Sequence, residues 1–323
     1  VTDADITSSG SILAEANGTV TLIDSTHTGG TITADATTAN ALGATCRVTS
    51  TTVAGLLEGL PGANAEFAGT IDNIAGDLRV QAGARFWSGN ATILGGTLSG
   101  GGVYDVESGQ TNFDGVGQTW NDLTIDVNTR GRLKLTGAIE NNALLRLVDT
   151  NPVIVDLQGH ANALVRVVGP VEIGGTGEIR FDTPWFNEFE VEPGSGSLLT
   201  LGPGQLVRTG GPTAEGRLTL DLVNAGRIDA EAGRITITNA STTNTGVLAA
   251  TAGGTLLVAN DAMTLHNDGG LLSSGAGSTI DLHGSLVGGA IEGPGRVLVV
   301  SPTSFTGHVT TMPGADVVVG RFG

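Results

Sequence analysis

The sequence has very few cysteines, lysines and aromatic residues. Of its 323 residues, one is cysteine (Cys46), one is lysine (Lys134), and aromatic residues make up 4%. A single cysteine excludes a disulfide within the chain, and a buried, unreactive thiol is the interpretation that fits it best. No run of 18 apolar residues occurs, so the sequence predicts no membrane-spanning helix and no membrane insertion.

Positive charge is scarce as well. The chain holds 15 Lys and Arg against 32 Asp and Glu, which gives a net charge of −17. An acidic chain repels nucleic acid and anionic membrane surfaces, so neither is an expected partner. A solvated acidic surface explains these acids better than a metal site does. We therefore expect no metal site and no cofactor; loosely bound Ca²⁺ is left open, but no motif supports it.

Glycine, by contrast, is abundant at 52 residues, and one short pattern recurs several times in the second half of the chain. The clearest copies are 224–237 and 244–258, and looser copies occupy 267–282 and 289–299. The first three copies each open with an asparagine, and these asparagines are almost evenly spaced along the sequence. Self-similarity at such a period indicates a stacked solenoid.

Each copy contains two short alternating apolar runs, such as Ile228/Ala230 and Ile235/Ile237, separated by a glycine-containing corner. A period of two places those side chains on one face of a strand. One copy has too little apolar surface to fold alone, whereas stacked copies bury a continuous core. We therefore predict an all-β fold, a single-stranded, right-handed parallel β-helix, or β-solenoid.

The repeat is less regular near the N-terminus. We expect residues 1–66 to form irregular N-terminal turns or a cap, and residues 67–323 to form the solenoid, continuous with it as one elongated domain. Within the first part, residues 52–59, which precede Pro61 and Gly62, are predicted to form one or two helical turns.

No arrangement of residues indicates catalysis. The five histidines are scattered, and no nucleophile elbow, phosphate loop or dinucleotide-binding motif occurs in a strand–turn–helix context. Glycoside hydrolysis would need two carboxylates about 5–9.5 Å apart. The nearest acidic cluster, 182–192, is interpreted as a solvated loop, so the chain is expected not to be an enzyme.

That cluster is nevertheless the one compositional outlier, because it concentrates acids with three aromatic residues. We predict a loop or bulged turn that projects from the solenoid. Exposed aromatic side chains stack on sugar rings or form protein contacts. Alternatively, the rings fold back over the flank of the solenoid. The candidate binding residues are Trp185, Phe186, Glu188, Phe189 and Glu190.

Asn224, Asn244 and Asn267 occupy the same position in successive copies. We interpret them as a structural ladder, in which each amide hydrogen-bonds to the amide one turn away.

The Asn-x-Gly-x-Ile/Leu-x-Ala pattern resembles the repeats of filamentous-haemagglutinin-like adhesins and the passenger regions of β-helical autotransporters. The match is clear over 224–299 and weaker over 67–201. The resemblance implies a secreted, extracellular or cell-surface bacterial protein with a structural or adhesive role in a fibre, filament or coat. The alternative function on the same fold is a carbohydrate-active enzyme or a polysaccharide-binding spike.

The two ends of the chain suggest how it assembles. The first strands, near Ile6 and Ile12, are rich in Thr and Ser, and 317–319 form an apolar final strand. An unprotected edge is a template for pairing with another chain. We expect head-to-tail association with further copies of itself, with other cell-surface components and polysaccharide as the remaining candidate partners. Alternatively, the chain is a fragment, and turns missing from it supply the cap.

Overall fold

The computed structural model describes residues 5–7, 9–15, 17–35, 44–107, 109–148, 163–184, 187–238, 241–300 and 305–320. The regular secondary structure in these ranges consists entirely of β-strands. None of these ranges contains a helix long and apolar enough to cross a membrane. The chain divides into two compact units, Val1–Arg146 and Leu147–Gly323.

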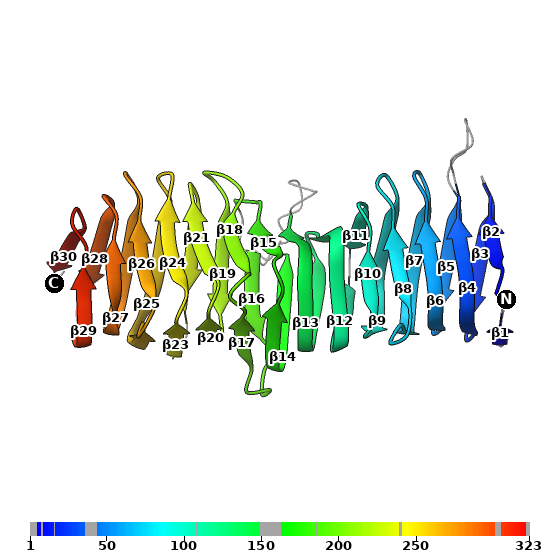
Figure 1. The fold of residues 1–323 in the computed structure, drawn as a ribbon, viewed down its shortest axis with the longest axis horizontal. Helices are drawn as coiled ribbons and strands as arrows, with labels where there is room; N and C mark the ends of the chain where they lie inside the picture. Colours follow the sequence, from blue (N-terminus) through cyan, green and yellow to red (C-terminus); the bar gives the residue numbers. More distant parts are fainter. Residues whose placement is uncertain are drawn as a thin grey trace, which may run out of the picture. The chain divides into compact units, whose positions relative to one another are not determined.

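The first unit is built from thirteen of the described strands (Figure 1). They are β1 (Asp5–Thr7), β2 (Ser11–Ala14), β3 (Thr19–Ile23), β4 (Thr26–Ala34), β5 (Thr45–Thr49), β6 (Thr52–Gly59), β7 (Asn64–Asp72), β8 (Asp77–Val80), β9 (Arg85–Leu94), β10 (Thr97–Ser99), β11 (Val103–Val106), β12 (Gly109–Val127) and β13 (Gly131–Leu147).

The second unit continues with seventeen described strands. They are β14 (Leu164–Gly174), β15 (Glu178–Phe181), β16 (Asn187–Val191), β17 (Leu198–Leu201), β18 (Leu206–Thr209), β19 (Glu215–Thr219), β20 (Asp221–Asn224), β21 (Arg227–Glu231), β22 (Arg234–Ile237), β23 (Ser241–Asn244), β24 (Val247–Thr251), β25 (Thr255–His266), β26 (Leu271–Ser274), β27 (Thr279–Glu292), β28 (Arg296–Val300), β29 (Phe305–Thr311) and β30 (Asp316–Gly320).

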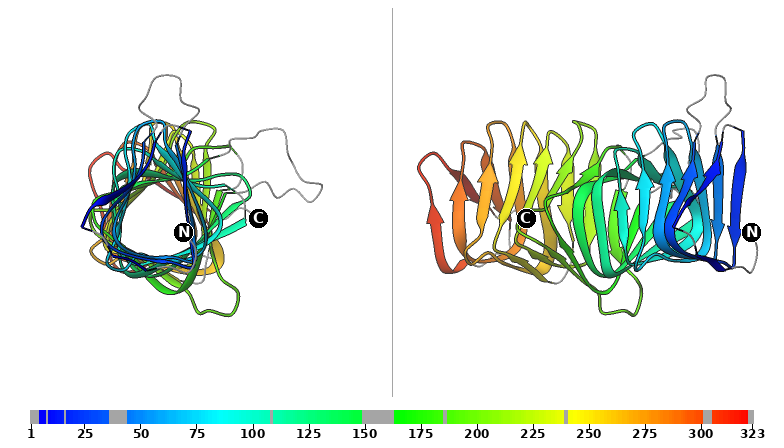
Figure 2. Two further views of the ribbon diagram at one scale, coloured as in Figure 1. Left: turned by 90° about the vertical axis from the view of Figure 1, so that its right-hand side faces the viewer. Right: turned by 45° about the vertical axis from the view of Figure 1, so that its right-hand side comes forward.

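Each strand pairs in parallel with the strand one turn further along the chain. In the second unit β20 pairs with β23, β21 with β24 and β22 with β25, so three strands separated by corners make one turn. The turns close around an interior, as the left view of Figure 2 shows for the N-terminal turns in blue. The predicted all-β parallel solenoid is therefore confirmed.

Inward-facing side chains stack in apolar rows. Ile228, Leu248, Leu272 and Ile291 are in register on four successive turns and are at most 1% exposed. Ile237 is fully buried on the same alternation that turns Thr236 outward. Burial of such rows is the main term that stabilises the fold, because isolated turns lack a core.

In the first unit the interior also holds a run of aromatic rings. The ring centroids of Phe67 and Phe86 lie 5.3 Å apart, and those of Phe67 and Tyr104 lie 5.9 Å apart. Phe113 lies 5.5 Å from both Tyr104 and Trp120 in edge-to-face contacts. These five rings are at most 1% exposed. They form a closely packed core behind the strands of the first unit.

Cys46 lies in β5 and is 1% exposed. Burial raises the pKa of its thiol to about 12. The predicted burial of this thiol is confirmed, and a raised pKa leaves less of the reactive thiolate at neutral pH.

The N-terminal turns differ from one sequence prediction. Residues 52–59 form strand β6 and no helical turn, because Leu57 and Gly59 continue the inward rows and β6 pairs in parallel with β4 and β8. The sequence-based boundary after residue 66 lies within β7, and β5 pairs with β7 just as later strands pair with one another.

Successive turns of the solenoid differ in the number of residues at their corners. Glu215 on β19 pairs with Arg234 after a short turn, whereas Asn187 on β16 pairs with Gly216 after a much longer one. The strands keep their register, since the extra residues lie in the connections between them.

Candidate functional site

The three repeat asparagines lie at one corner of successive turns in the second unit. Each is fully buried. The Nδ2 atom of Asn224 donates to Oδ1 of Asn244 at 2.7 Å, and Nδ2 of Asn244 donates to Oδ1 of Asn267 at 2.6 Å. Each Nδ2 also donates a longer bond of 3.3 Å to a carbonyl of its own corner, on Gly226, Gly246 and Gly270, respectively. The amides form a one-directional ladder that satisfies the buried Oδ1 atoms of Asn244 and Asn267 and so serves structure. Oδ1 of Asn224, the first member, accepts no hydrogen bond.

A corner glycine packs against the last amide of this ladder, as Gly270 packs against Asn244 within it. A Cβ at Gly289, the corner position of the next turn, would lie 2.0 Å from Nδ2 of Asn267. The first unit repeats the arrangement, because a Cβ at Gly96 would lie 2.5 Å from Nδ2 of Asn73. A side chain cannot occupy either position while the preceding amide stays in place.

The candidate binding residues of 185–190 are not part of a projecting loop where the structure describes them. Trp185 and Phe186 lie outside the described residues. Glu188, Phe189 and Glu190 belong to β16, which pairs with β14 and β19. The loop prediction is therefore wrong for these three residues, because their alternating pattern fits a strand of the solenoid wall.

The prediction that Phe189 stacks on a sugar is also wrong, because Phe189 is an inward-facing residue of β16. It is fully buried and contacts Phe181 in the interior, with ring centroids 6.3 Å apart. Glu188 and Glu190 face outward but already have partners. Thr219 donates to Glu188 at 2.6 Å, and Arg166 donates to Glu190 at 2.6 Å.

The first unit contains an outward row that the sequence analysis missed. Trp87 on β9 is in register with Glu66 on β7 and with Asp105 on β11, and Asp105 is in register with Asp126 on β12. Because its neighbours Phe86 and Ser88 are fully buried, the half-buried indole of Trp87 faces outward. We call Glu66, Trp87, Asp105 and Asp126 the Trp87 row. The strands that carry it pair in the order β7, β9, β11 and β12 and lie in the light blue to green part of Figure 1.

Arginines cover the two aspartates of this row, which are only 4% (Asp105) and 6% (Asp126) exposed. Arg85 donates to Asp105 and, at 2.7 Å, to Glu107. Arg146 donates two hydrogen bonds, of 2.8 and 2.6 Å, to the carboxylate of Asp126. The hydrogen bond to Asp105 raises the pKa of Arg85. Two carboxylates one strand spacing apart would repel each other, and these guanidinium groups offset that repulsion.

The Trp87 row combines a flat apolar ring with fixed polar groups on a wall that a rigid core supports. Such a surface suits a flat ligand with apolar C–H faces and hydroxyl groups at its rim, which is the chemistry of a sugar ring. A signal was present in the sequence: Phe86 and Trp87 are adjacent in an alternating strand, so one aromatic ring must face solvent.

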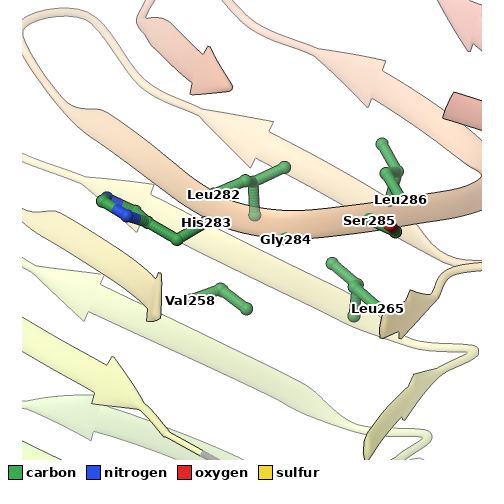
Figure 3. Close-up of a pocket in the computed structure, with 7 residues that line it drawn as sticks. All are labelled: Val258, Leu265, Leu282, His283, Gly284, Ser285 and Leu286. Atoms are coloured by element: carbon green, nitrogen blue, oxygen red, sulfur yellow. The ribbon is translucent and has the colours of Figure 1, made fainter. Parts of the chain in front are cut away.

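The second unit carries a groove on its outer wall over β19, β22 and β25. Its volume is about 490 Å³, and its charged lining residues are Glu215, Arg217 and Arg234. A second hollow, between β25 and β27, measures only about 10 Å³ and is surrounded by apolar side chains including Val258, Leu265 and Leu282 (Figure 3). That volume holds about one water molecule, so this hollow is a packing void at a corner.

In the ranges that the structure describes, no three His, Cys, Asp or Glu side chains gather as metal ligands.

No protein-family model matches the chain, and no curated protein matches it. Among solved structures the chain is similar to the crystal structure of a TibC-catalyzed hyper-glycosylated TibA55-350 fragment. The sequence identity is 17%, the TM-score is 0.30, and the match covers 99% of this chain and 96% of that one. A likeness of this size bears on neither ligand nor function.

Proposed function

We propose that this chain is a structural and adhesive β-solenoid that works outside the cell, in a surface fibre, filament or coat. It makes contact through the outer faces of its walls, without a cofactor. The observation that carries the proposal is the Trp87 row, in which an outward indole stands in register with carboxylates held by arginine. We propose that this row is a contact site for polysaccharide.

The chemistry of the row supports a sugar ligand. Packing a pyranose face on the indole removes apolar area from water. The Arg85–Glu107 pair lies beside the ring, with half of the Arg85 side chain exposed, and supplies donors and acceptors for hydroxyl groups. A wall of paired strands holds these groups in place before the ligand arrives, which reduces the entropy lost on binding.

A hydrolase is the alternative that the geometry brings closest. Asp105 and Asp126 stand on adjacent strands, which are about 4.8 Å apart, and retaining glycosidases place their carboxyl groups about 5–5.5 Å apart. Both carboxylates, however, already accept charge-assisted hydrogen bonds from guanidinium groups. Neither is placed to give a proton to a leaving group, so the row favours binding over catalysis.

The test is a titration of the purified chain with neutral and acidic polysaccharides, followed by tryptophan fluorescence and by an assay for new reducing ends. We expect binding without turnover. Trp87→Ala should weaken binding about 10- to 100-fold, from the loss of one buried aromatic contact. Val116→Ala is the matched control, because Val116 is an exposed apolar residue of β12 outside the row.

Undiminished binding by Trp87→Ala would refute the proposed contact site. Release of reducing ends that Asp105→Asn or Asp126→Asn abolishes would establish the hydrolase instead.

Self-association is the second part of the proposal. Val319 on β30 is in register with the fully buried Val299, yet it is 66% exposed. We propose that copies of the chain associate with one another by stacking turns in this same parallel register.

A further inference from the structure

The groove over β19, β22 and β25 is formed by short side chains between long ones. Arg217, Thr236 and Leu257 are in register across the three strands. Thr238 and Ala259 also line the groove. The two threonines and the alanine are short, whereas the arginines and Leu257 rise beside them. The volume of about 490 Å³ lies within the range of ligand sites, about 300–1,000 Å³.

This groove contains two arginines, whereas the protein as a whole is strongly acidic. The net charge is −17, and most arginines in the described ranges form ion pairs, among them Arg146 with Asp126, Arg166 with Glu190 and Arg208 with Glu178. Arg234 is exposed, and no acidic side chain in the described part of the chain lies within salt-bridge distance of it. Glu215 faces it in register but forms no ion pair with it.

An exposed arginine with no ion pair adds little to stability, and in an acidic protein it is a local attraction for anions. A guanidinium group binds a planar carboxylate through two parallel hydrogen bonds. Arg217 is exposed on the neighbouring strand and lines the same groove. The threonine hydroxyls and Glu215 add groups that exchange hydrogen bonds with neutral hydroxyls.

We propose that this groove binds a carboxylated sugar unit of an acidic polysaccharide. Arg234 and Arg217 take the carboxylate, while Glu215, Thr236 and Thr238 take ring hydroxyls. This site is distinct from the Trp87 row, lies in the other unit and requires a negatively charged ligand, whereas the Trp87 row also accommodates neutral sugars.

The experiment compares polygalacturonate oligomers with neutral dextran oligomers of equal length, using calorimetry on the full chain at low and high salt. Arg234→Ala should weaken uronate binding about 10- to 100-fold, and Arg234→Lys should restore part of it, since lysine keeps the charge but loses the bidentate geometry. High salt should weaken binding to the parent chain.

Arg296→Ala is the control for loss of an exposed arginine. Unlike Arg234, Arg296 has an acidic partner, since its Nε lies 3.9 Å from Oδ2 of Asp316. Arg296 lies further along the same outward row, since Thr255 pairs with both Arg234 and Thr279, and Thr279 pairs with Arg296. This variant removes the same charge outside the groove, so it should bind uronate like the parent. Because Arg234 is exposed, its variants should keep the parent's circular dichroism and melting midpoint.

Equal binding of uronate by Arg234→Ala and the parent would overturn the proposal. So would equal binding of uronate and dextran, or an equal loss with Arg296→Ala, which would indicate nonspecific charge attraction. Uronate binding that Trp87→Ala abolishes and Arg234→Ala preserves would overturn the groove site while leaving the proposed function standing.

Discussion

Replacing Asn244 by leucine should destabilise the second unit measurably although it leaves no cavity, because leucine is close to asparagine in shape. Asn244 is the middle member of the ladder and is fully buried. Its Oδ1 accepts from Asn224 at 2.7 Å, and its Nδ2 donates to Asn267 at 2.6 Å. The substitution removes both bonds at once.

The two neighbours are affected unequally. Nδ2 of Asn224 retains 3.3 Å contacts to the carbonyls of Gly226 and Val247, so part of its hydrogen bonding survives. Oδ1 of Asn267 loses the donor that holds it. A buried unsatisfied polar group costs about 1–3 kcal/mol. One full and one partial loss therefore give an expected decrease of about 2–4 kcal/mol in the free energy of unfolding.

The assay is urea unfolding of a double-mutant cycle with Asn244→Leu, Asn267→Leu and the double variant. If the ladder exists, the second substitution costs less once the first is present, with a coupling energy of about 0.5–3 kcal/mol. Asn142→Leu is the matched control, because Asn142 donates an inter-turn amide bond of 3.2 Å to Asn121 from a half-buried outward position. It should cost less than about 0.5 kcal/mol.

An additive cycle, or equal losses for Asn244→Leu and Asn142→Leu, would refute the reasoning, since the ladder would then contribute no more than a surface contact.

Three further predictions follow from burial, titration and strand edges. Ile237→Asp should lower the free energy of unfolding by more than about 4 kcal/mol, because it places a charge in the core. Thr236→Asp, on the outward face, should change it by less than about 1 kcal/mol. Equal urea midpoints for the two variants would contradict the alternation of inward and outward residues. Burial lowers the pKa of His27, so the turns around β4 should be most stable above the unfolded pKa of about 6.5 and lose stability as the pH falls below it. Hydrogen exchange of β4 at pH 7.5 and 5.5, corrected for the pH dependence of the intrinsic exchange rate, checks this, and His27→Leu should give equal protection factors at both. Finally, Val318→Pro removes a donor from β30 and should reduce self-association in light scattering; unchanged association would count against stacking at that edge.

The part of the second unit from Asn224 onward was predictable because its turns have nearly constant length. Asn224 and Asn244 begin successive copies of one pattern, so equivalent positions can be aligned by eye, and Ile235 and Ile237 show which face is buried. Parallel stacking then follows, since equivalent residues of successive turns must pair. The hydrogen bonds between the asparagines are what such a register produces.

The candidate binding residues were harder to place because the turn length changes around them. Leu164 pairs with Glu188, and Glu188 pairs in turn with Arg217, but the second of these steps along the sequence is longer than the first. Without the register, the acids of 188–192 look like a solvated loop. The pairing of Glu190 with Arg166 depends on three-dimensional stacking that no local pattern encodes.

Trp87 was missed for a related reason. Glu66, Trp87 and Asp105 belong to three successive turns, so none of the three is near another in sequence. Similarly, Leu56, Leu57 and Glu58 form a local pattern that suits a helix, but pairing with β4 and β8 makes them a strand. In both cases contacts between turns outweigh local preference.

The interchangeability of the ladder positions has an evolutionary consequence. Deleting residues 225–244 would join Asn224 to Thr245 and bring the amide of Asn224 to the place from which Asn244 now reaches Asn267. The second unit would shorten by one strand spacing, about 4.8 Å, with its remaining turns in register. Recombination between repeats can therefore lengthen or shorten the second unit in small, nearly equal steps without inventing a new fold, while the Trp87 row in the first unit is inherited unchanged.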